Sequence, residues 1–183
     1  MYQERFPNDT VIIADAHQYL LDHYKEFDFI WSSPPCPTHS KSRYWAYGNS
    51  NPIFPDMKLY EEILFLQYHA KDKFKWVVEN VNPYYEPLII AKKIGRHLFW
   101  SNFKIDDFDK KDITGKLNFE SKYNPLKKHH DIKVFDYSGN QNKLKILRNL
   151  VDYELGEHIL NCALNIQPKK VIASLFDETY LTL

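Results

Sequence analysis

A cysteine set among prolines is the residue in this sequence best suited to nucleophilic chemistry. Cys36 lies in the run SSPPCP at residues 32–37, directly after an apolar stretch. Three prolines in four positions exclude both a helix and a regular strand, so we expect a stiff loop there. A free cysteine is most often a small buried core residue. This setting instead favours contact with a ligand, where a thiolate is a strong nucleophile.

A carboxylate that follows another apolar stretch is the second candidate. Glu79 begins the run ENVNP at residues 79–83, after the apolar residues 75–78. An isolated glutamate at the end of a strand is usually solvated. Cys36 and Glu79 are stronger candidates together than alone, because residues that follow neighbouring parallel strands lie at the same edge of the sheet. Open α/β sheets bind their ligands at that edge.

Alternating apolar strands and amphipathic helices predict the elements that must position these residues. We expect strands at residues 10–14, 27–31, 75–78 and 98–103. We expect helices at 17–24, from about Asp56 to residue 70, at 84–93 and within 143–164. The second helix has Asp56 as its expected cap, and its apolar stripe consists of Leu59, Ile63, Leu66 and Ala70. The pattern predicts an α/β fold with a parallel sheet flanked by helices.

The length of 183 residues fits one domain with a substantial core. Residues 104–143 are rich in polar residues and lack sustained periodicity, so we expect a loop-rich insertion there. It would separate a partial catalytic unit at 1–103 from carboxyl-terminal helices at 144–183. Basic and acidic side chains number 24 each, so the net charge neither requires nor excludes a polyanionic partner.

Cysteine usage and hydropathy restrict the class of protein. Cys36 and Cys162 are far apart in the chain, which argues against a disulfide scaffold and against a CxxC zinc site. No metal is therefore expected. No apolar run has the length of a membrane span, and the first residues do not resemble a signal peptide. We expect a cytoplasmic protein without a membrane partner.

The runs SPPCP at 33–37 and ENV at 79–81 resemble the nucleophile and ENV motifs of the DNA cytosine-C5 methyltransferases. The order and spacing of the two motifs are more specific than either alone. The resemblance implies a Rossmann-like fold dependent on S-adenosylmethionine, with Cys36 as nucleophile and Glu79 as the group that activates cytosine. Arg96-His97 before LFW resembles the family's later arginine motif, with one usual basic position missing. This implies that Arg96 is catalytic and orients or polarises the base's carbonyl.

The same resemblance implies a set of cofactor contacts. Asp15 resembles the acidic position that contacts the adenine side of S-adenosylmethionine, although a helix-capping role is equally compatible with its place before a helix. Pro34 belongs to the nucleophile motif. The run RNLV at 148–151 resembles the family's closing Gly-Asn-x-Val motif, with arginine in place of glycine. Asn149 and Val151 are thereby implied as cofactor-binding residues.

DNA is the implied partner, and the loop after the nucleophile is implied to contact it. Ser40 lies where the nucleophile motif often ends in a serine. Lys41 and Arg43 follow, and the loop also supplies aromatic side chains. Such residues suit contacts with phosphates and bases, although a solvated loop is the default interpretation of such a run.

The chain departs from the family where its cofactor loop is expected. The Phe-x-Gly-x-Gly motif and the acidic residue after the second strand are absent, so the fold would lack its first two strands. In the family's sheet these strands lie between those expected here at 10–14 and 27–31, and their loss leaves unpaired backbone. A truncated start, a second chain that supplies the glycine-rich loop, or direct pairing of the remaining strands would each account for this.

Three other functions stay open. An adenine-N6 methyltransferase has a similar Pro-Pro motif, but it usually ends in an aromatic residue where this chain has Cys36. A tRNA cytosine-C5 methyltransferase would use the same cysteine and glutamate, and only substrate assays separate it from a DNA enzyme. A catalytically silent DNA-binding or regulatory subunit would keep Cys36 and Glu79 but lack its own cofactor site. The target sequence is not readable from the chain.

Overall fold

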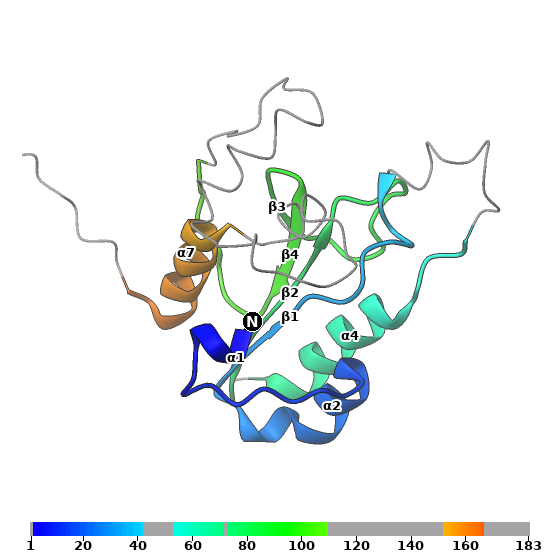
Figure 1. Cartoon of the computed structure of the whole chain (residues 1–183). Helices are drawn as coiled ribbons and strands as arrows, with labels where there is room; N and C mark the ends of the chain where they lie inside the picture. The colour runs from blue at the N-terminus through cyan, green and yellow to red at the C-terminus, as the bar shows by residue number, and fades with distance from the viewer. Residues whose placement is uncertain (1, 42–52, 72, 110–151, 167–183) are drawn as a thin grey trace, which may run out of the picture.

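A computed structural model describes residues 2–41, 53–71, 73–109 and 152–166 of the chain. These residues form an α/β fold (Figure 1). In chain order the elements are α1 (Tyr2–Arg5), α2 (Ala16–His23), the 3-10 turn η1 (Tyr24–Glu26), β1 (Phe29–Ser32), α4 (Lys58–Ala70), β2 (Lys75–Val81), β3 (Lys92–Ile94), β4 (His97–Ser101) and α7 (Tyr153–Leu164).

The described strands form one mixed sheet in the order β1-β2-β4-β3. Strands β1 and β2 are parallel, with Ser32 opposite Val78. Strands β2 and β4, and β4 and β3, are antiparallel. The expected parallel sheet is therefore wrong except for the β1–β2 pair. A tight turn at residues 95–96 reverses the chain between β3 and β4, and Gly95 there has a φ of 58°, which glycine adopts without strain.

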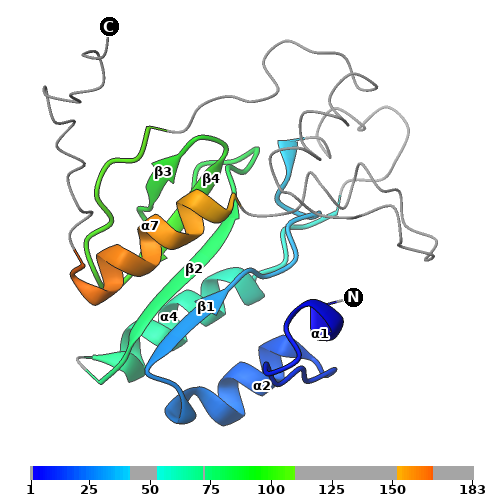
Figure 2. The ribbon, with the colours of Figure 1, turned by 60° about the vertical axis from the view of Figure 1, so that its left-hand side comes forward.

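Helices cover both faces of the sheet, and the core is divided accordingly (Figure 2). On one face α4 packs with the alternate β2 residues Trp76 and Val78. On the other face α7 packs against Val77 from the same strand. The four residues of the predicted α4 stripe are all buried, so this helix and its inward face are confirmed. Burial of such side chains stabilises the fold by roughly 1.5–3 kcal/mol each.

The predicted strand at residues 10–14 is wrong. The segment is extended and exposed, and Ile13 has 99% of its surface accessible. A strand needs a neighbour that accepts and donates its backbone hydrogen bonds. Within the described residues no strand pairs with this segment, and β1 has its one paired neighbour, β2, on the opposite side.

The predicted helix at residues 84–93 is also wrong. Proline at positions 83 and 87 interrupts the helical hydrogen bonds, and β3 begins at Lys92. Side chains from distant elements take over the backbone groups of this segment. The Leu88 amide donates to Tyr60 Oη at 3.2 Å, and the Ile89 carbonyl accepts from Trp100 Nε1 at 2.9 Å.

The remaining predicted elements are confirmed with shifted ends. Helix α2 covers Ala16–His23 and β1 covers Phe29–Ser32, each within two residues of the predicted start. Helix α4 begins at Lys58, and its N-cap is Met57 and not Asp56 as predicted, although the Lys58 amide donates to Asp56 Oδ1 at 3.1 Å. The last predicted helix is observed as α7 from Tyr153, whereas residues 143–151 lie outside the described residues. Of the expected insertion, only residues 104–109 are described, and Ile105 among them is buried in the core.

Candidate functional site

The predicted nucleophile lies on a loop at the carboxyl end of β1. Residues 33–36 have no regular secondary structure, which confirms the loop expected from the prolines. Cys36 is half-buried. Its carbonyl oxygen accepts from the amides of His39 at 3.0 Å and Ser40 at 3.1 Å. Cys36 therefore opens a turn with a fixed backbone, and Ser40, an expected DNA contact, closes it.

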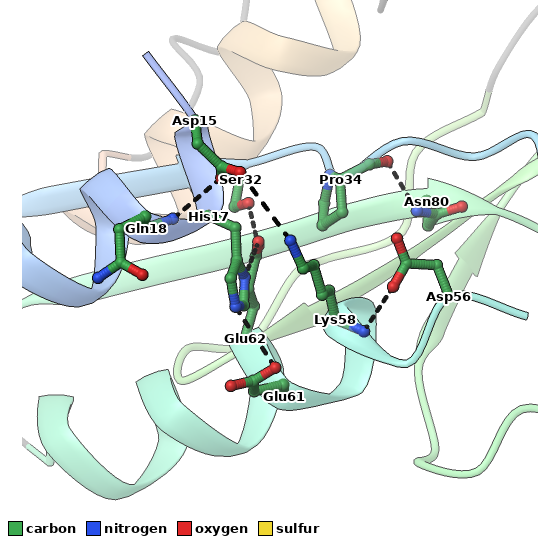
Figure 3. A network of polar contacts seen from close by, with 10 residues as sticks. All are labelled: Asp15, His17, Gln18, Ser32, Pro34, Asp56, Lys58, Glu61, Glu62 and Asn80. Atoms are coloured by element: carbon green, nitrogen blue, oxygen red, sulfur yellow. Dashed lines mark hydrogen bonds and ion pairs between the residues drawn. The ribbon is translucent and has the colours of Figure 1, made fainter.

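Hydrogen bonds join this loop to the end of β2. The side-chain amide of Asn80 donates to the Pro34 carbonyl oxygen at 3.0 Å (Figure 3). Ser40 forms an isolated antiparallel bridge with Pro83. The two predicted motif segments, far apart in the sequence, are thus brought together in the fold. The parallel pairing of β1 and β2 causes this, since the segments that follow the two strands leave the sheet at the same edge.

Glu79 lies inside β2, not after it as predicted. It pairs with Phe99 of β4, and 8% of its surface is exposed. Its Oε1 atom lies 3.7 Å from Nε2 of His97, which is also buried. His97 pairs with Val81, so His97 and Glu79 are diagonal neighbours on one face of the sheet. The sequence did not single out His97 as a separate site residue, and only the strand register identifies it.

Arg96 has a different environment from His97. It lies on the turn before β4, and its side chain is exposed. Its backbone carbonyl accepts from the Asn82 amide at 2.9 Å. Arg96 is therefore close to the turn after β2, and His97 is a described residue that contacts the Glu79 carboxylate.

A pocket of about 920 Å³ lies beside the open edge of β1. Asp15 and Pro34, both expected to bind the cofactor, line this same pocket, and Pro35 extends it to the residue before Cys36. Cys36 and Glu79 are not among its lining residues. The volume is in the range of small-molecule sites. Its apolar walls come from the segment before α2 and from β1, including Ile12, Ala14, Phe29, Ile30 and Trp31.

Asp15 is the N-cap of α2, which confirms the capping alternative for this residue. Its carboxylate accepts from the Gln18 amide at 3.1 Å and lies 4.0 Å from the Lys58 ammonium. The Gln18 hydrogen bond, and then the positive charge of Lys58, hold the pKa of Asp15 below its usual range. The carboxylate is exposed to the pocket and remains available as a hydrogen-bond acceptor.

A buried polar network forms another part of the pocket wall (Figure 3). Glu62 of α4 is 4% exposed. Its Oε1 atom is 2.9 Å from His17 Nδ1, and its Oε2 atom accepts from Ser32 Oγ at 2.5 Å. Glu61 lies 3.3 Å from the other ring nitrogen of His17. The network ties α2, α4 and β1 together, and nothing in the sequence indicated it because its members are far apart along the chain.

The remaining predicted site residues are only partly described. Lys41 is exposed at the end of the Cys36 loop. Arg43, Asn149 and Val151 lie outside the described residues.

Comparisons of the chain with protein-family models, curated proteins and solved structures found no match. In the described part of the chain, no three His, Cys, Asp or Glu residues are grouped so that they could hold a metal ion. Among the described helices, none combines the length and apolar character needed to cross a bilayer. Function must therefore be inferred from the residues and their geometry.

Proposed function

We propose that this chain is a DNA cytosine-C5 methyltransferase that uses S-adenosylmethionine and has Cys36 as its nucleophile. The observation that carries the proposal is the 3.0 Å hydrogen bond from Asn80 Nδ2 to the Pro34 carbonyl oxygen. It joins the loop that carries the thiol to the strand that carries the Glu79 carboxylate. Covalent activation of cytosine needs both groups at one base, and the proposal is supported by their positions on and directly after two adjacent parallel strands.

Cytosine C5 is too weak a nucleophile to accept a methyl group unassisted, and a covalent adduct would overcome this. In the proposed mechanism the Cys36 thiolate adds to C6, and the displaced electron pair makes C5 an enamine carbon. Glu79 hydrogen-bonds to N3 and to the exocyclic amine, which stabilises the adduct. After C5 is methylated, loss of the C5 proton restores the double bond and the C6–S bond breaks, releasing the thiolate. The target base must leave the duplex stack to reach these groups.

Two basic side chains border the proposed base site. Arg96, exposed on the turn beside Asn82, is proposed to orient or polarise the carbonyl of the base. His97, 3.7 Å from the Glu79 carboxylate, is proposed to fix the direction of that carboxylate. A preorganised carboxylate stabilises the adduct more than a mobile one, because it need not reorient during the reaction.

The pocket beside β1 fits the implied cofactor. S-adenosylmethionine would supply an activated methyl group when bound. Asp15 offers an ionised carboxylate to an exocyclic amine, and Pro34 offers an apolar surface to an aromatic ring. The volume of about 920 Å³ is large enough for a nucleoside with an amino-acid tail. Asn149 and Val151 remain proposed contacts.

DNA is the proposed substrate, and the end of the Cys36 loop is the proposed contact. Lys41 is exposed there, and Arg43 follows it in the sequence. Their charges suit the phosphate backbone, which would position the duplex over Cys36. The Ser40 backbone is held by its amide hydrogen bond to the Cys36 carbonyl and lies in a β-bridge with Pro83. Its hydroxyl is proposed to contribute to the same contact.

We further propose that extended segments from a second chain, or from additional sequence before Met1, complete the pocket. Strand β1 is the last strand on its side of the described sheet. Across the pocket from it, Ile12 is 54% exposed. Ile13, the next residue in the chain, is 99% exposed. Exposed apolar side chains opposite an open strand edge are suited to cover by added strands. Such strands would bring the glycine-rich cofactor loop, and without them the chain would act as a silent DNA-binding subunit.

The test is covalent trapping on DNA that contains 5-fluorocytosine, with S-adenosylmethionine present and mass mapping of the adduct. Fluorine at C5 blocks the loss of a proton there, so the adduct accumulates. An adduct at Cys36, lost in Cys36→Ala and kept in the matched Cys162→Ser variant, is the expected result. An adduct on tRNA but not on DNA would show that the substrate is RNA and favour the tRNA methyltransferase. DNA binding without adduct or cofactor binding, also after a candidate partner is added, would favour the silent subunit.

A further inference from the structure

His39 is a buried residue between the Cys36 loop and the segment after β2. Only 1% of its surface is exposed. Its Nδ1 atom lies 2.5 Å from the hydroxyl oxygen of Tyr85, and the two ring centroids are 5.9 Å apart. A short polar contact inside a dry environment is stronger than the same contact in water. The ring of His39 is therefore held in one orientation by Tyr85.

The hydroxyl groups that reach His39 form a directed relay. The Leu88 amide donates to Tyr60 Oη at 3.2 Å, and Tyr60 Oη donates to Tyr85 Oη at 3.4 Å. Since Tyr85 accepts from Tyr60, its own proton is directed to His39 Nδ1. The relay begins in the turn before β3 and passes through α4, which carries Tyr60. It thus fixes the loop residue His39 against two other elements.

The relay requires a neutral imidazole and a neutral phenol. Burial lowers the pKa of His39, and the backbone of Asp56 opposes this shift only in part. Burial raises the pKa of Tyr85. Near pH 7 both groups are therefore uncharged. The contact between His39 Nδ1 and Tyr85 Oη therefore joins two neutral groups.

The backbone of His39 joins the same two segments as its side chain. Its amide donates to the Cys36 carbonyl at 3.0 Å, and its carbonyl accepts from the Tyr84 amide at 3.1 Å. One residue thus closes the turn that begins at Cys36 and fixes that turn to the segment after Glu79.

We infer that His39 is a positioning residue, which holds the Cys36 loop against the end of β2 through Tyr85 and Tyr60. As far as catalysis is concerned, this inference rests on the proposed function. The spacing between the thiol and the Glu79 carboxylate then depends on the relay. A displacement of about 1 Å in such a pair costs on the order of 100-fold in rate.

Four variants separate positioning from general stability. Tyr85→Phe removes the hydroxyl that bonds to His39, and His39→Leu removes the acceptor. His39→Asn restores a side-chain amide near the place of Nδ1. Tyr24→Phe is the matched control, because the Tyr24 hydroxyl makes a similar contact of 3.1 Å with His69 Nδ1 between η1 and α4.

The first measurement is amide hydrogen exchange at three positions. The amides of His39 and Ser40 bond to the Cys36 carbonyl within the loop, and the Tyr84 amide bonds to the His39 carbonyl between the two segments. We expect Tyr85→Phe and His39→Leu to speed exchange there by about tenfold, because local opening becomes easier. The second is alkylation of Cys36 by iodoacetamide in a Cys162→Ser background. The same two variants should raise its rate about threefold or more, since the half-buried thiol becomes more accessible. Tyr24→Phe should change neither quantity at these positions.

The third measurement is the rate of the 5-fluorocytosine adduct over a range of DNA concentrations. We expect the maximal rate to fall about tenfold or more in Tyr85→Phe and His39→Leu, with half-saturation by DNA unchanged, and His39→Asn to recover most of it. Unchanged exchange and alkylation would overturn the inference. Faster exchange with an unchanged maximal adduct rate would overturn the catalytic role. If wild type forms no adduct while exchange and alkylation respond, the methyltransferase proposal fails and the positioning of Cys36 stands.

Discussion

His97 Nε2 lies 3.7 Å from Glu79 Oε1, and both side chains are almost fully buried within the sheet. We predict that His97→Leu slows formation of the 5-fluorocytosine adduct by about tenfold or more, since the carboxylate loses the neighbour that orients it. His97→Gln keeps an N–H donor, so its rate of adduct formation should lie between the rates of His97→Leu and wild type. Adduct kinetics at saturating DNA are the measurement. A wild-type rate in His97→Leu would show that Glu79 does not depend on this neighbour.

Arg96→Ala is the companion test for the other basic residue. Its exposed side chain predicts a change in unfolding free energy within about 0.5 kcal/mol. Any large loss of adduct formation in this variant would therefore report on the reaction and not on folding. Urea unfolding and adduct kinetics on the same preparation measure the two effects. Unchanged adduct formation would remove Arg96 from the proposed mechanism.

Asn80 on β2 and Asn102, the residue after β4, offer a matched pair of side-chain amides. Asn80 bonds to the Pro34 carbonyl and the Val81 amide, and Asn102 bonds to the Phe74 carbonyl and the Trp76 amide at the opposite end of β2. We predict that alanine at either position costs about 1–3 kcal/mol of unfolding free energy, because backbone groups lose their partners.

Only Asn80→Ala should change the Cys36 loop. In a Cys162→Ser background it should raise the alkylation rate of Cys36, whereas Asn102→Ala should leave that rate at the wild-type value. Equal rates in the two variants would mean that the bond to Pro34 does not restrain the loop.

Glu62 and Glu61 differ in burial although both contact His17. The Glu62 side chain is 5% exposed and the Glu61 side chain 57%. We predict that Glu62→Ala costs about 2–4 kcal/mol, since Ser32 and His17 lose a buried partner. Glu61→Ala should cost less than about 1 kcal/mol, as is usual for solvent-exposed pairs. Urea unfolding measures both, and similar losses in the two variants would contradict the assigned network.

The lowered pKa of His39 predicts how stability changes with pH. The unfolded chain binds this proton at a pKa of about 6.5 and the folded chain at a lower one. The unfolding free energy therefore falls as the pH drops below about 6.5, and this contribution levels off below the folded pKa. For one proton the slope cannot exceed about 1.4 kcal/mol per pH unit.

His39→Asn should remove this dependence, because it removes the titrating group and keeps a polar side chain. Urea unfolding at about pH 7 and about pH 5.5 gives the comparison. If wild type and His39→Asn lose the same unfolding free energy between the two pH values, His39 has the same pKa in the folded and the unfolded chain.

Local patterns were sufficient to predict α4, β2 and the proline-rich loop. The α4 stripe repeats at helical spacing, so its inward residues, such as Leu66, follow from the sequence alone. The approach of the Cys36 loop to β2 also followed, since two successive strands were expected to be parallel neighbours. That expectation was right for β1 and β2. It was wrong for β2 and β4, which are antiparallel because the chain reverses at Gly95 directly before β4.

The remaining features depend on contacts between distant parts of the chain. The prolines at 83 and 87 argue locally against a helix at 84–93, but the bonds that Tyr60 and Trp100 make to the backbone of this segment are not contained in any local pattern. Residues 10–14 have strand composition but no strand beside them in the described part. His39 and His97 were missed for the same reason, since one depends on a relay from α4 and the other on the register of β4.

Among the described strands, β1 has a neighbour on one side only, and this has a practical consequence for handling the protein. The backbone groups on its other side, and the exposed Ile13, can contact an identical surface on another molecule. The isolated chain should therefore self-associate as its concentration rises, and solubility should limit preparations before thermal unfolding does. A lysine at position 13 would add charge beside that edge and should extend the concentration range in which the chain stays monodisperse.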